Sequence, residues 1–324
     1  MRQLTRPRTE IDSTTQHSRQ AEPSILSPAA KVIIAYLLII VALAVVFSNR
    51  VELWWIILLG HAAVISLVLV AARIASRRPH RVTSRANLAA IINGWYPVVL
   101  ITLTYKELEY LIPRLHPRDY DWPLARIDYR LFGFHPTVWL ERLAHPALSE
   151  TLQLAYSCYY FLPVALGFVL WRSRRFQAFH FFVFILALGF YLSYLGYIIV
   201  PAIGPRFVLA DLQTTPLTGL LMFEWVRGTL DRAEGITRDC FPSGHTALTL
   251  LVLYYARRFS RPLFWVILPV AAAIIAGTVY LRYHYVIDVI AGAMLALLVI
   301  TLAGSVHKWM GGAILDAESG SGEH

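Results

Sequence analysis

The stretch that decides the fold is Asp-Cys-Phe-Pro-Ser-Gly-His-Thr at residues 239–246, where a polar loop runs into an apolar helix. Ser243 suits the N-cap position of that helix, and Gly244 lets a ligand approach the backbone closely. The first N–H groups of a helix have no partner within the helix, so they can bind an anion. His245 adds a side chain that transfers protons near neutral pH. Together these features predict an anion-binding site at the start of a helix.

A second stretch of this kind, Tyr-Leu-Arg-Tyr-His-Tyr-Val-Ile-Asp, occupies residues 280–288 at another boundary between a loop and a helix. His284 and Asp288 are four residues apart, so they share one face of the predicted helix. A carboxylate in that position can orient the imidazole. Two histidines, an orienting acid and an anion-binding helix end favour phosphoryl transfer.

The pair of motifs, Pro-Ser-Gly-His followed by His-x-x-x-Asp, resembles the type 2 phosphatidic acid phosphatase (PAP2) superfamily, which also includes the vanadium haloperoxidases. Gly-Pro-Arg at 204–206 and Tyr-x-x-Asp after His284 are most similar to the inositol phosphorylceramide synthase-like branch. The similarity covers roughly residues 85–305. Either motif alone would be a weak signal, but both in this order, each at a membrane boundary, are a strong one.

The resemblance implies a role for each matching residue. His284 attacks phosphorus and forms a transient phosphohistidine, while Asp288 holds its imidazole in the correct tautomer. His245 protonates the leaving alkoxide. The phosphoryl oxygens are bound by Arg206, the Ser243 hydroxyl and the Gly244 N–H. The resemblance implies no metal and no other cofactor.

The sequence departs from the superfamily pattern at two cationic positions. Where the first motif usually carries a lysine this chain has Ile199, and where the third usually carries an arginine it has Thr278. Arg282, two residues before His284, is the candidate that replaces the missing cation. This reduced set argues against the ordinary lipid phosphatases and is common in the synthase-like branch.

The composition predicts an integral membrane protein. Of 324 residues, 57% are hydrophobic and only 15% are charged, and the apolar residues fall in long blocks. The formal net charge of +9 comes largely from arginines in short loops between these blocks, so it indicates topology and gives no support for nucleic-acid binding. The two cysteines, Cys158 and Cys240, form no metal-binding pattern, although Cys240 lies beside the predicted site.

The apolar blocks predict an all-α, polytopic bundle of about eight membrane helices. Two N-terminal helices fall within 31–84, and a six-helix catalytic domain covers 85–305. Residues 1–30 and 306–324 are expected to be disordered or flexible cytoplasmic tails. The predicted helices are 32–48, 53–73, 87–104, 150–171, 177–200, 243–257, 262–281 and 284–305. His61 and Asn93, inside two of these helices, are expected to make polar contacts between helices.

The arginines then predict the orientation of the bundle. Three groups of arginines, within 73–85, 172–175 and 257–261, fall on one side if eight helices cross the membrane with both termini on that side. The positive-inside rule makes this side the cytoplasm. The loops 201–242 and 281–284 share the opposite face, so the active site is predicted to be extracytoplasmic.

A mixed segment at 105–149 interleaves charged and aromatic residues, as short amphipathic helices at a membrane interface do. Its aspartates are candidates for recognition of a lipid headgroup. The helix at 243–257 is short, about 22 Å at 1.5 Å per residue, against a hydrocarbon core of ~30 Å. A start below the membrane surface would place His245 in a recess that lipids reach from the side.

The second half of the reaction separates two enzyme functions, and we place the lipid phosphatase first. If water takes the phosphoryl group, the protein is a phosphatase acting on a lipid phosphate; if a lipid hydroxyl takes a phospho-headgroup, it is a phosphotransferase. A reduced cationic set suits a phosphodiester, which favours the phosphotransferase. The third alternative is a non-catalytic membrane transporter or scaffold. The interruption of a predicted helix at Asn93, Gly94 and Pro97 would favour a transporter, since transporters bind substrates at broken helices. The sequence leaves the oligomeric state open.

Overall fold

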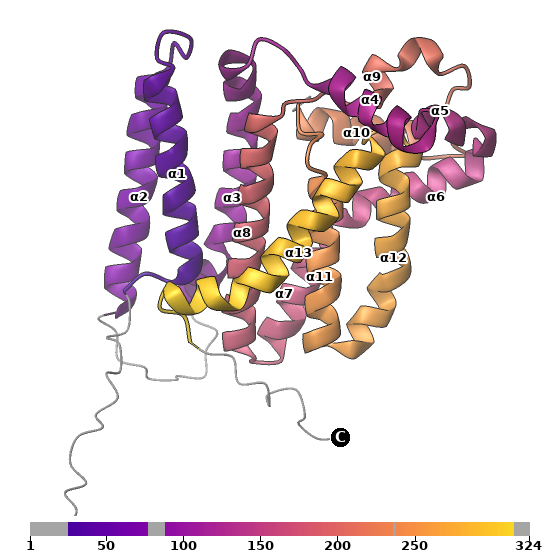
Figure 1. Ribbon diagram of the computed structural model, residues 1–324. Coiled ribbons are helices and arrows are strands. Elements are labelled where there is room, and N and C mark those ends of the chain that lie inside the picture. The colour runs from indigo at the N-terminus through magenta and orange to yellow at the C-terminus, as the bar shows by residue number, and fades with distance from the viewer. Residues whose placement is uncertain (1–24, 77–87, 236–237, 314–324) are drawn as a thin grey trace, which may run out of the picture.

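Long apolar helices run side by side through the molecule, and short helices and loops cover one end of them (Figure 1). This computed structural model describes residues 25–76, 88–235 and 238–313, and for 75, 76 and 88–93 it describes the backbone alone. All regular structure in these ranges is helical, so the all-α prediction is confirmed. Most of the two predicted tails, 1–30 and 306–324, lies outside the described residues, but the last helix continues to Trp309.

The long helices form the body of the bundle. They are α1 (Pro28–Val46), α2 (Trp54–Ser76), α3 (Leu88–Leu115), α7 (Phe161–Arg172), α8 (Phe176–Ile199), α11 (Gly244–Phe259), α12 (Arg261–Tyr280) and α13 (Val286–Trp309). The covering layer contains α4 (Asp121–Phe132), α5 (Pro136–Trp139), α6 (Pro146–Ser157), α9 (Pro205–Val208) and α10 (Phe223–Glu234). Three short 3₁₀ turns, Leu140–Leu143, Cys158–Tyr160 and Ala210–Leu212, connect them.

Within the described ranges, six segments are long and apolar enough to cross a membrane, which makes the chain an integral membrane protein. They are Pro28–Val46, Trp54–Ile74, Pro146–Arg172, Phe176–Ile199, Arg261–Tyr280 and Val286–Trp309. Of the eight predicted spans, α3 and α11 do not meet this criterion. The 16 residues of α11 reach only about 24 Å, and α3 carries charged residues beyond residue 105. Both still run through the bundle beside the other long helices (Figure 1).

Two helices differ from the prediction in ways that shape the covering layer. The helix expected at 87–104 continues to Leu115, so residues 105–115 of the segment predicted to lie in the interface are part of α3. The single helix expected at 150–171 is interrupted at Cys158–Tyr160, which lets α6 lie across the end of the bundle while α7 descends through it (Figure 1). Pro163 lacks the N–H that would bond to the carbonyl four residues earlier, which weakens the helix at this point.

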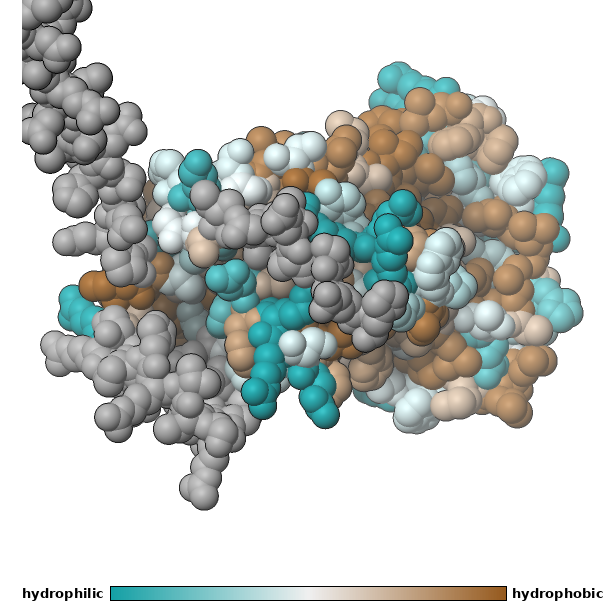
Figure 2. Space-filling view, turned by 90° about the horizontal axis from the view of Figure 1, so that it is seen from below, coloured by the Kyte–Doolittle hydropathy of each residue, from teal (hydrophilic) through white to brown (hydrophobic). Residues whose placement is uncertain are grey.

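Helix α8 is the centre of the bundle, since α1, α3, α7, α11 and α13 all pack against it. Most of its side chains are buried, including Phe179, Phe182 and Phe184. The end of the bundle that carries the α7–α8 and α11–α12 connections contains several arginines, and Arg175 donates a hydrogen bond to the carbonyl of Phe259 between the two connections. Figure 2, seen from this end, shows hydrophilic residues gathered over its middle and hydrophobic residues beside them.

A buried polar contact attaches α2 to the rest of the bundle. His61 Nε2 lies 3.0 Å from Glu107 Oε2 on α3, and its Nδ1 lies 3.3 Å from the carbonyl oxygen of Leu37 on α1. The prediction that His61 joins helices is therefore confirmed. The side chain of Asn93 lies outside the described part of the structure.

Removing one member of the His61–Glu107 pair is expected to destabilise the protein more than removing both. His61→Ala leaves the carboxylate of Glu107 without its partner in apolar surroundings, at a cost of roughly 3 kcal/mol. His61→Leu combined with Glu107→Met replaces the pair by apolar packing and is expected to recover most of that loss. Thermal unfolding of the purified protein in detergent measures both effects. A double variant that is less stable than His61→Ala would contradict the pairing.

Candidate active site

Three loops meet at the covered end of the bundle and bring the predicted residues together. The loop that follows α8 contains Arg206, the loop before α11 contains Cys240, and the loop between α12 and α13 contains His284. Backbone hydrogen bonds join them: the N–H of Arg206 donates to the carbonyl of Arg282, and that of Ser243 donates to the carbonyl of Asp288. Segments far apart in the chain thus form one site.

His284 is buried, and the hydrogen bond it makes sets its tautomer. Its Nδ1 lies 2.9 Å from the carbonyl oxygen of Cys240. A carbonyl oxygen only accepts hydrogen bonds, so Nδ1 carries the proton and a neutral ring has its lone pair on Nε2. The backbone N–H of His284 donates to the carbonyl of Thr278 and holds the residue in the turn. The side chain is thereby prepared to act as a nucleophile at Nε2.

Asp288 is fully buried one helical turn after His284. Its Oδ2 lies 3.5 Å from His284 Nδ1 and accepts a hydrogen bond of 2.8 Å from the N–H of Tyr285. The thiol of Cys240 donates to the same oxygen over 3.0 Å. Asp288 therefore stands beside the protonated nitrogen of His284, as the spacing in the sequence predicts, and Cys240 helps to position both residues.

His245 lies on the opposite side of the site, with its ring centroid 5.8 Å from that of His284. Tyr156 and Tyr159 contact its two sides, with ring centroids at 4.3 and 4.2 Å. Its Nδ1 is 3.3 Å from the Tyr156 hydroxyl, while its buried Nε2 has no hydrogen-bond partner among the described residues. Such a buried polar atom is available to a water molecule or a ligand.

Arg206 and His284 line the same small pocket, which leaves about 400 Å³ free of protein atoms. The Arg206 guanidinium lies 5.2 Å from the ring of Tyr283 and is paired with Asp231 at 2.9 Å on the exposed side. A second cation, Arg227, lies 5.8 Å from the same ring. Arg206 is therefore where the sequence predicts it, beside the candidate nucleophile.

Ser243 and Gly244 form the start of α11, as expected, but neither lines this pocket. The Ser243 hydroxyl is buried and accepts hydrogen bonds from the backbone and side chain of Thr246, which is the N-cap contact. A Cβ at residue 244 would lie 2.2 Å from the hydroxyl oxygen of Tyr197, so only glycine fits against α8 here. Their binding of phosphate stays a prediction, while their part in packing the turn is direct.

Arg282, like Ser243 and Gly244, is a predicted site residue that does not line the pocket. Its guanidinium is buried and pairs with Glu141 at 3.0 Å, and it also donates to Gln213 and to the carbonyl of Thr215. These contacts hold the covering layer over the loop. The chain lies in the left-handed region at Arg282, with φ of 67°. Arg282 is therefore close to His284 in the sequence, but its guanidinium is not in the pocket that contains Arg206.

Two aspartates of α4 support the site, a role that the sequence did not reveal. Asp128 accepts the N–H groups of Val286 and Ile287 at 2.7 and 2.9 Å, which are the first donors of α13. Asp121 accepts those of Ile203 and Gly204 at 2.9 and 2.8 Å. Both carboxylates are almost fully buried. The candidate role in headgroup recognition is thus wrong for these two residues, because backbone groups already occupy them.

Two acidic side chains, Glu234 and Asp239, also line the pocket and were not predicted. The hydroxyls of Tyr160 and Tyr105 donate to them. Burial, and then the negative charge of Asp239, raises the pKa of Glu234 to about 7. Burial raises the pKa of Asp239 as well, against the hydrogen bond from Tyr105 and the nearby His284. Near neutral pH the negative charge of this pocket therefore varies.

Among the described residues, one group has metal-ligand atoms close together: Cys240, His284 and Asp288, within 4.8 Å of one another. The short contacts in this group are explained by hydrogen bonds, since the thiol donates to Asp288 and His284 Nδ1 donates to the Cys240 carbonyl. The same atoms could ligate a divalent ion only after losing these hydrogen bonds.

A family model and a curated relative match this chain. The family model described as PAP2 superfamily matches residues 122–302, more than half of the chain. A PA-phosphatase related-family protein of Dictyostelium discoideum is 27% identical over 164 residues, which cover 44% of this chain and 30% of that protein. The chain thus matches less than a third of this relative's length. No solved structure gives a significant match.

Loss of the Asp128 carboxylate is expected to loosen the start of α13. Asp128→Ala removes two charge-assisted hydrogen bonds to backbone N–H groups, which together contribute about 3 kcal/mol. The exposed Asp211 provides a control, since Asp211→Ala is expected to change the free energy of unfolding by less than about 0.5 kcal/mol. Thermal unfolding in detergent compares the two variants. Equal stability of the variants would refute the capping role.

The titration of Glu234 is expected to control anion binding. Its folded-state pKa is above the ordinary value of 4.5, so the group is neutral below about pH 7 and becomes negative as the pH rises through that value. The affinity for inorganic phosphate is then expected to fall as the pH rises above 7. The free energy of unfolding is expected to decrease as the pH rises from 4.5 to 7, because the unfolded state loses this proton first. Binding measured across this range with Glu234→Gln as the comparison isolates the effect. An unchanged pH profile in that variant would assign it to other groups.

Proposed function

The chain belongs to the PAP2 superfamily, and from this premise we propose that it cleaves a phosphate ester or diphosphate of a lipid through a phosphohistidine. Membership of the family and the apolar helices support a phosphatase-type enzyme that acts in the membrane on a lipid phosphate. The observation that carries the mechanism is the hydrogen bond between His284 Nδ1 and the Cys240 carbonyl, because it leaves the Nε2 lone pair free to attack.

In the first step, Nε2 of His284 forms a bond to phosphorus while the bond from phosphorus to the lipid oxygen breaks. The charge that develops on His284 is stabilised by the carboxylate of Asp288 beside Nδ1. His245, protonated when the anionic phosphate binds, gives its proton to the leaving oxygen, and the neutral alcohol departs. Arg206 binds the phosphoryl oxygens after exchanging part of its contact with Asp231.

In the second step, His245 takes a proton from water, whose oxygen attacks phosphorus. The bond from phosphorus to Nε2 then breaks and returns the electron pair to His284. Each step uses protein side chains and water alone, so we propose that turnover needs no metal ion. The orienting, nucleophilic and proton-transferring groups are all within one buried cluster.

A phosphotransferase is the second candidate, because it would share the phosphohistidine and differ in the acceptor. The observation that favours it is the pair of carboxylates, Glu234 and Asp239, at the pocket that contains Arg206. Carboxylates accept hydrogen bonds from hydroxyl groups, and they disfavour a highly charged phosphate. A hydroxyl-bearing acceptor or a singly charged diester suits this arrangement.

The arginines at the opposite end of the bundle support an extracytoplasmic active site with both termini in the cytoplasm. The loops of the site and the connections that carry these arginines lie at opposite ends of the long helices (Figure 1). The bilayer and a lipid phosphate are the partners that this orientation implies.

Both histidines are expected to be essential for turnover, in different ways. The full-length protein in mixed micelles is given radiolabelled phosphatidic acid, polyprenyl diphosphate or phosphatidylinositol, with and without a lipid acceptor, and with a chelator present. Wild type is expected to release phosphate and to hold label on the protein after a rapid quench. His284→Ala is expected to lose both signals, and His245→Ala to lose turnover by about 10³-fold, as general acids contribute.

The other outcomes separate the remaining functions. A labelled phospholipid formed only with acceptor identifies a phosphotransferase. Equal signals in wild type and both variants leave a transporter or scaffold. Loss of activity in the chelator rejects the metal-independent mechanism.

A further inference from the structure

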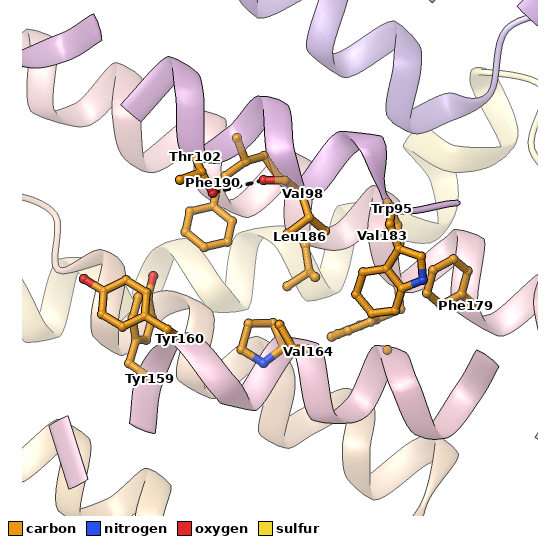
Figure 3. Close-up of a pocket in the computed structure, with 14 residues that line it drawn as sticks. Trp95, Val98, Thr102, Tyr159, Tyr160, Val164, Phe179, Val183, Leu186 and Phe190 are labelled. Carbon is orange, nitrogen blue, oxygen red and sulfur yellow. Dashed lines mark hydrogen bonds between the residues drawn. The ribbon is translucent and has the colours of Figure 1, made fainter. Parts of the chain in front are cut away.

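An apolar groove lies on the side of the bundle between α3 and α7, over α8 (Figure 3). Its walls are formed by Val98 and Thr102 of α3 and by Val164 and Gly167 of α7, and its floor by Val183 and Leu186 of α8. We refer to it as the lateral groove. It has a cavity volume of about 90 Å³, and its lining is almost entirely hydrocarbon and aromatic.

We expect the side of the bundle where the lateral groove opens to face the hydrocarbon of the bilayer. Val164 is 43% exposed at its rim, whereas Val183 and Leu186 on the floor are buried. Helix α8 and the Pro146–Arg172 segment are both apolar enough to span the membrane. A molecule can therefore enter this groove sideways from the lipid phase.

One end of the lateral groove lies beside the candidate active site. Tyr159 and Tyr160 close this end (Figure 3). The ring of Tyr159 also contacts that of His245, at 4.2 Å between centroids, and the hydroxyl of Tyr160 donates to Glu234 in the phosphate pocket. A pair of adjacent tyrosines thus forms the boundary between an apolar groove and a polar pocket.

We propose that the lateral groove binds the hydrocarbon chain of the lipid alcohol that leaves during the reaction. This inference rests on the proposed function, because it uses His245 as the group that protonates the leaving oxygen. The chain of the leaving alcohol begins within a few bonds of that oxygen. An apolar channel that starts beside the His245 ring is therefore in position to receive it, while the phosphoryl group faces Arg206 and His284.

The far end of the lateral groove limits how much chain it holds. Trp95 and Phe179 close it, with ring centroids 5.3 Å apart (Figure 3). From Trp95 to Thr102 the helix rises about 10 Å at 1.5 Å per residue. A Cβ at Gly167 would lie 3.0 Å from the Trp95 ring, so glycine lets α7 approach this tryptophan closely. The groove therefore takes one extended alkyl or isoprenoid segment near the headgroup, and a longer chain must leave it for the bilayer.

Filling the groove is expected to impair long-chain substrates selectively. Val98→Trp places an indole inside the groove, and Val99→Trp is the matched control, since Val99 is the next residue, is 57% exposed and does not line it. The full-length protein in micelles is given dioleoyl and dihexanoyl phosphatidic acid. Val98→Trp is expected to lower kcat/KM for the dioleoyl substrate by about tenfold or more, as keeping about two methylene groups from burial would do. Dihexanoyl turnover is expected to change by less than about twofold.

A photo-crosslinking measurement reports on the groove without using turnover. Phosphatidic acid with a diazirine in its acyl chain is expected to label the peptides that contain Val98 and Val164 in wild type and in His284→Ala, and to lose that labelling in Val98→Trp. Unlabelled phosphatidic acid is expected to compete, and phosphatidylcholine is not.

Three outcomes would overturn the inference. Val98→Trp and Val99→Trp could have equal activity on both substrates, or the label could be found on α12 in place of the groove. Phosphatidylcholine could also compete as well as phosphatidic acid, which would show that the groove binds an ordinary bilayer lipid. Failure of the proposed function is separate. In that case wild type releases no phosphate from any substrate, whatever the labelling shows.

Discussion

The hydrogen bond between His284 Nδ1 and the carbonyl oxygen of Cys240 is the contact on which the site depends. It joins the loop before α11 to the loop before α13, and it assigns the proton of the imidazole to the nitrogen that faces away from the substrate. Asp288 then stands beside that nitrogen, and the Cys240 thiol donates to the carboxylate. A cysteine that matches no metal or disulfide pattern thus has a structural explanation in the positions of its backbone carbonyl and its thiol.

This contact is held by buried acids in a layer that lies outside the long helices. Asp128 binds the start of α13, Asp121 binds the backbone before Arg206, and Glu141 binds Arg282. Loops at the end of a membrane bundle have many backbone N–H groups without helical partners, and a carboxylate can satisfy two of them at once. The charged segment between α3 and α6 therefore holds the loops of the site in place. Its aspartates act on backbone groups of other loops, over more than 75 residues of sequence.

The site and the lateral groove show how polar chemistry and lipid access can share one bundle. Tyr156 and Tyr159 surround His245 with aromatic surface, and Tyr160 faces Glu234. A tyrosine has an apolar ring and a polar hydroxyl, which suits it to a boundary between apolar and polar surroundings. The break between α6 and α7 places these residues at the level of the pocket. An uninterrupted helix would have carried them along the bundle without turning the chain over the site.

The sequence by itself determined the all-α membrane fold, the two motifs and the pairing of His284 with Asp288, because these follow from local patterns: long apolar blocks, helix starts and a spacing of four residues. The tertiary structure decided which charges reach the phosphate pocket. Arg282, two residues before His284 in the sequence, forms an ion pair with Glu141, whereas Arg206 comes from α9, Glu234 from the end of α10 and Asp239 from the segment before α11. It also decided that α6 and α7 are separate helices and that α3 and α7 leave a groove over α8. Such features depend on how segments far apart in the chain pack together, and the short-range periodicity of a sequence contains no information on that packing.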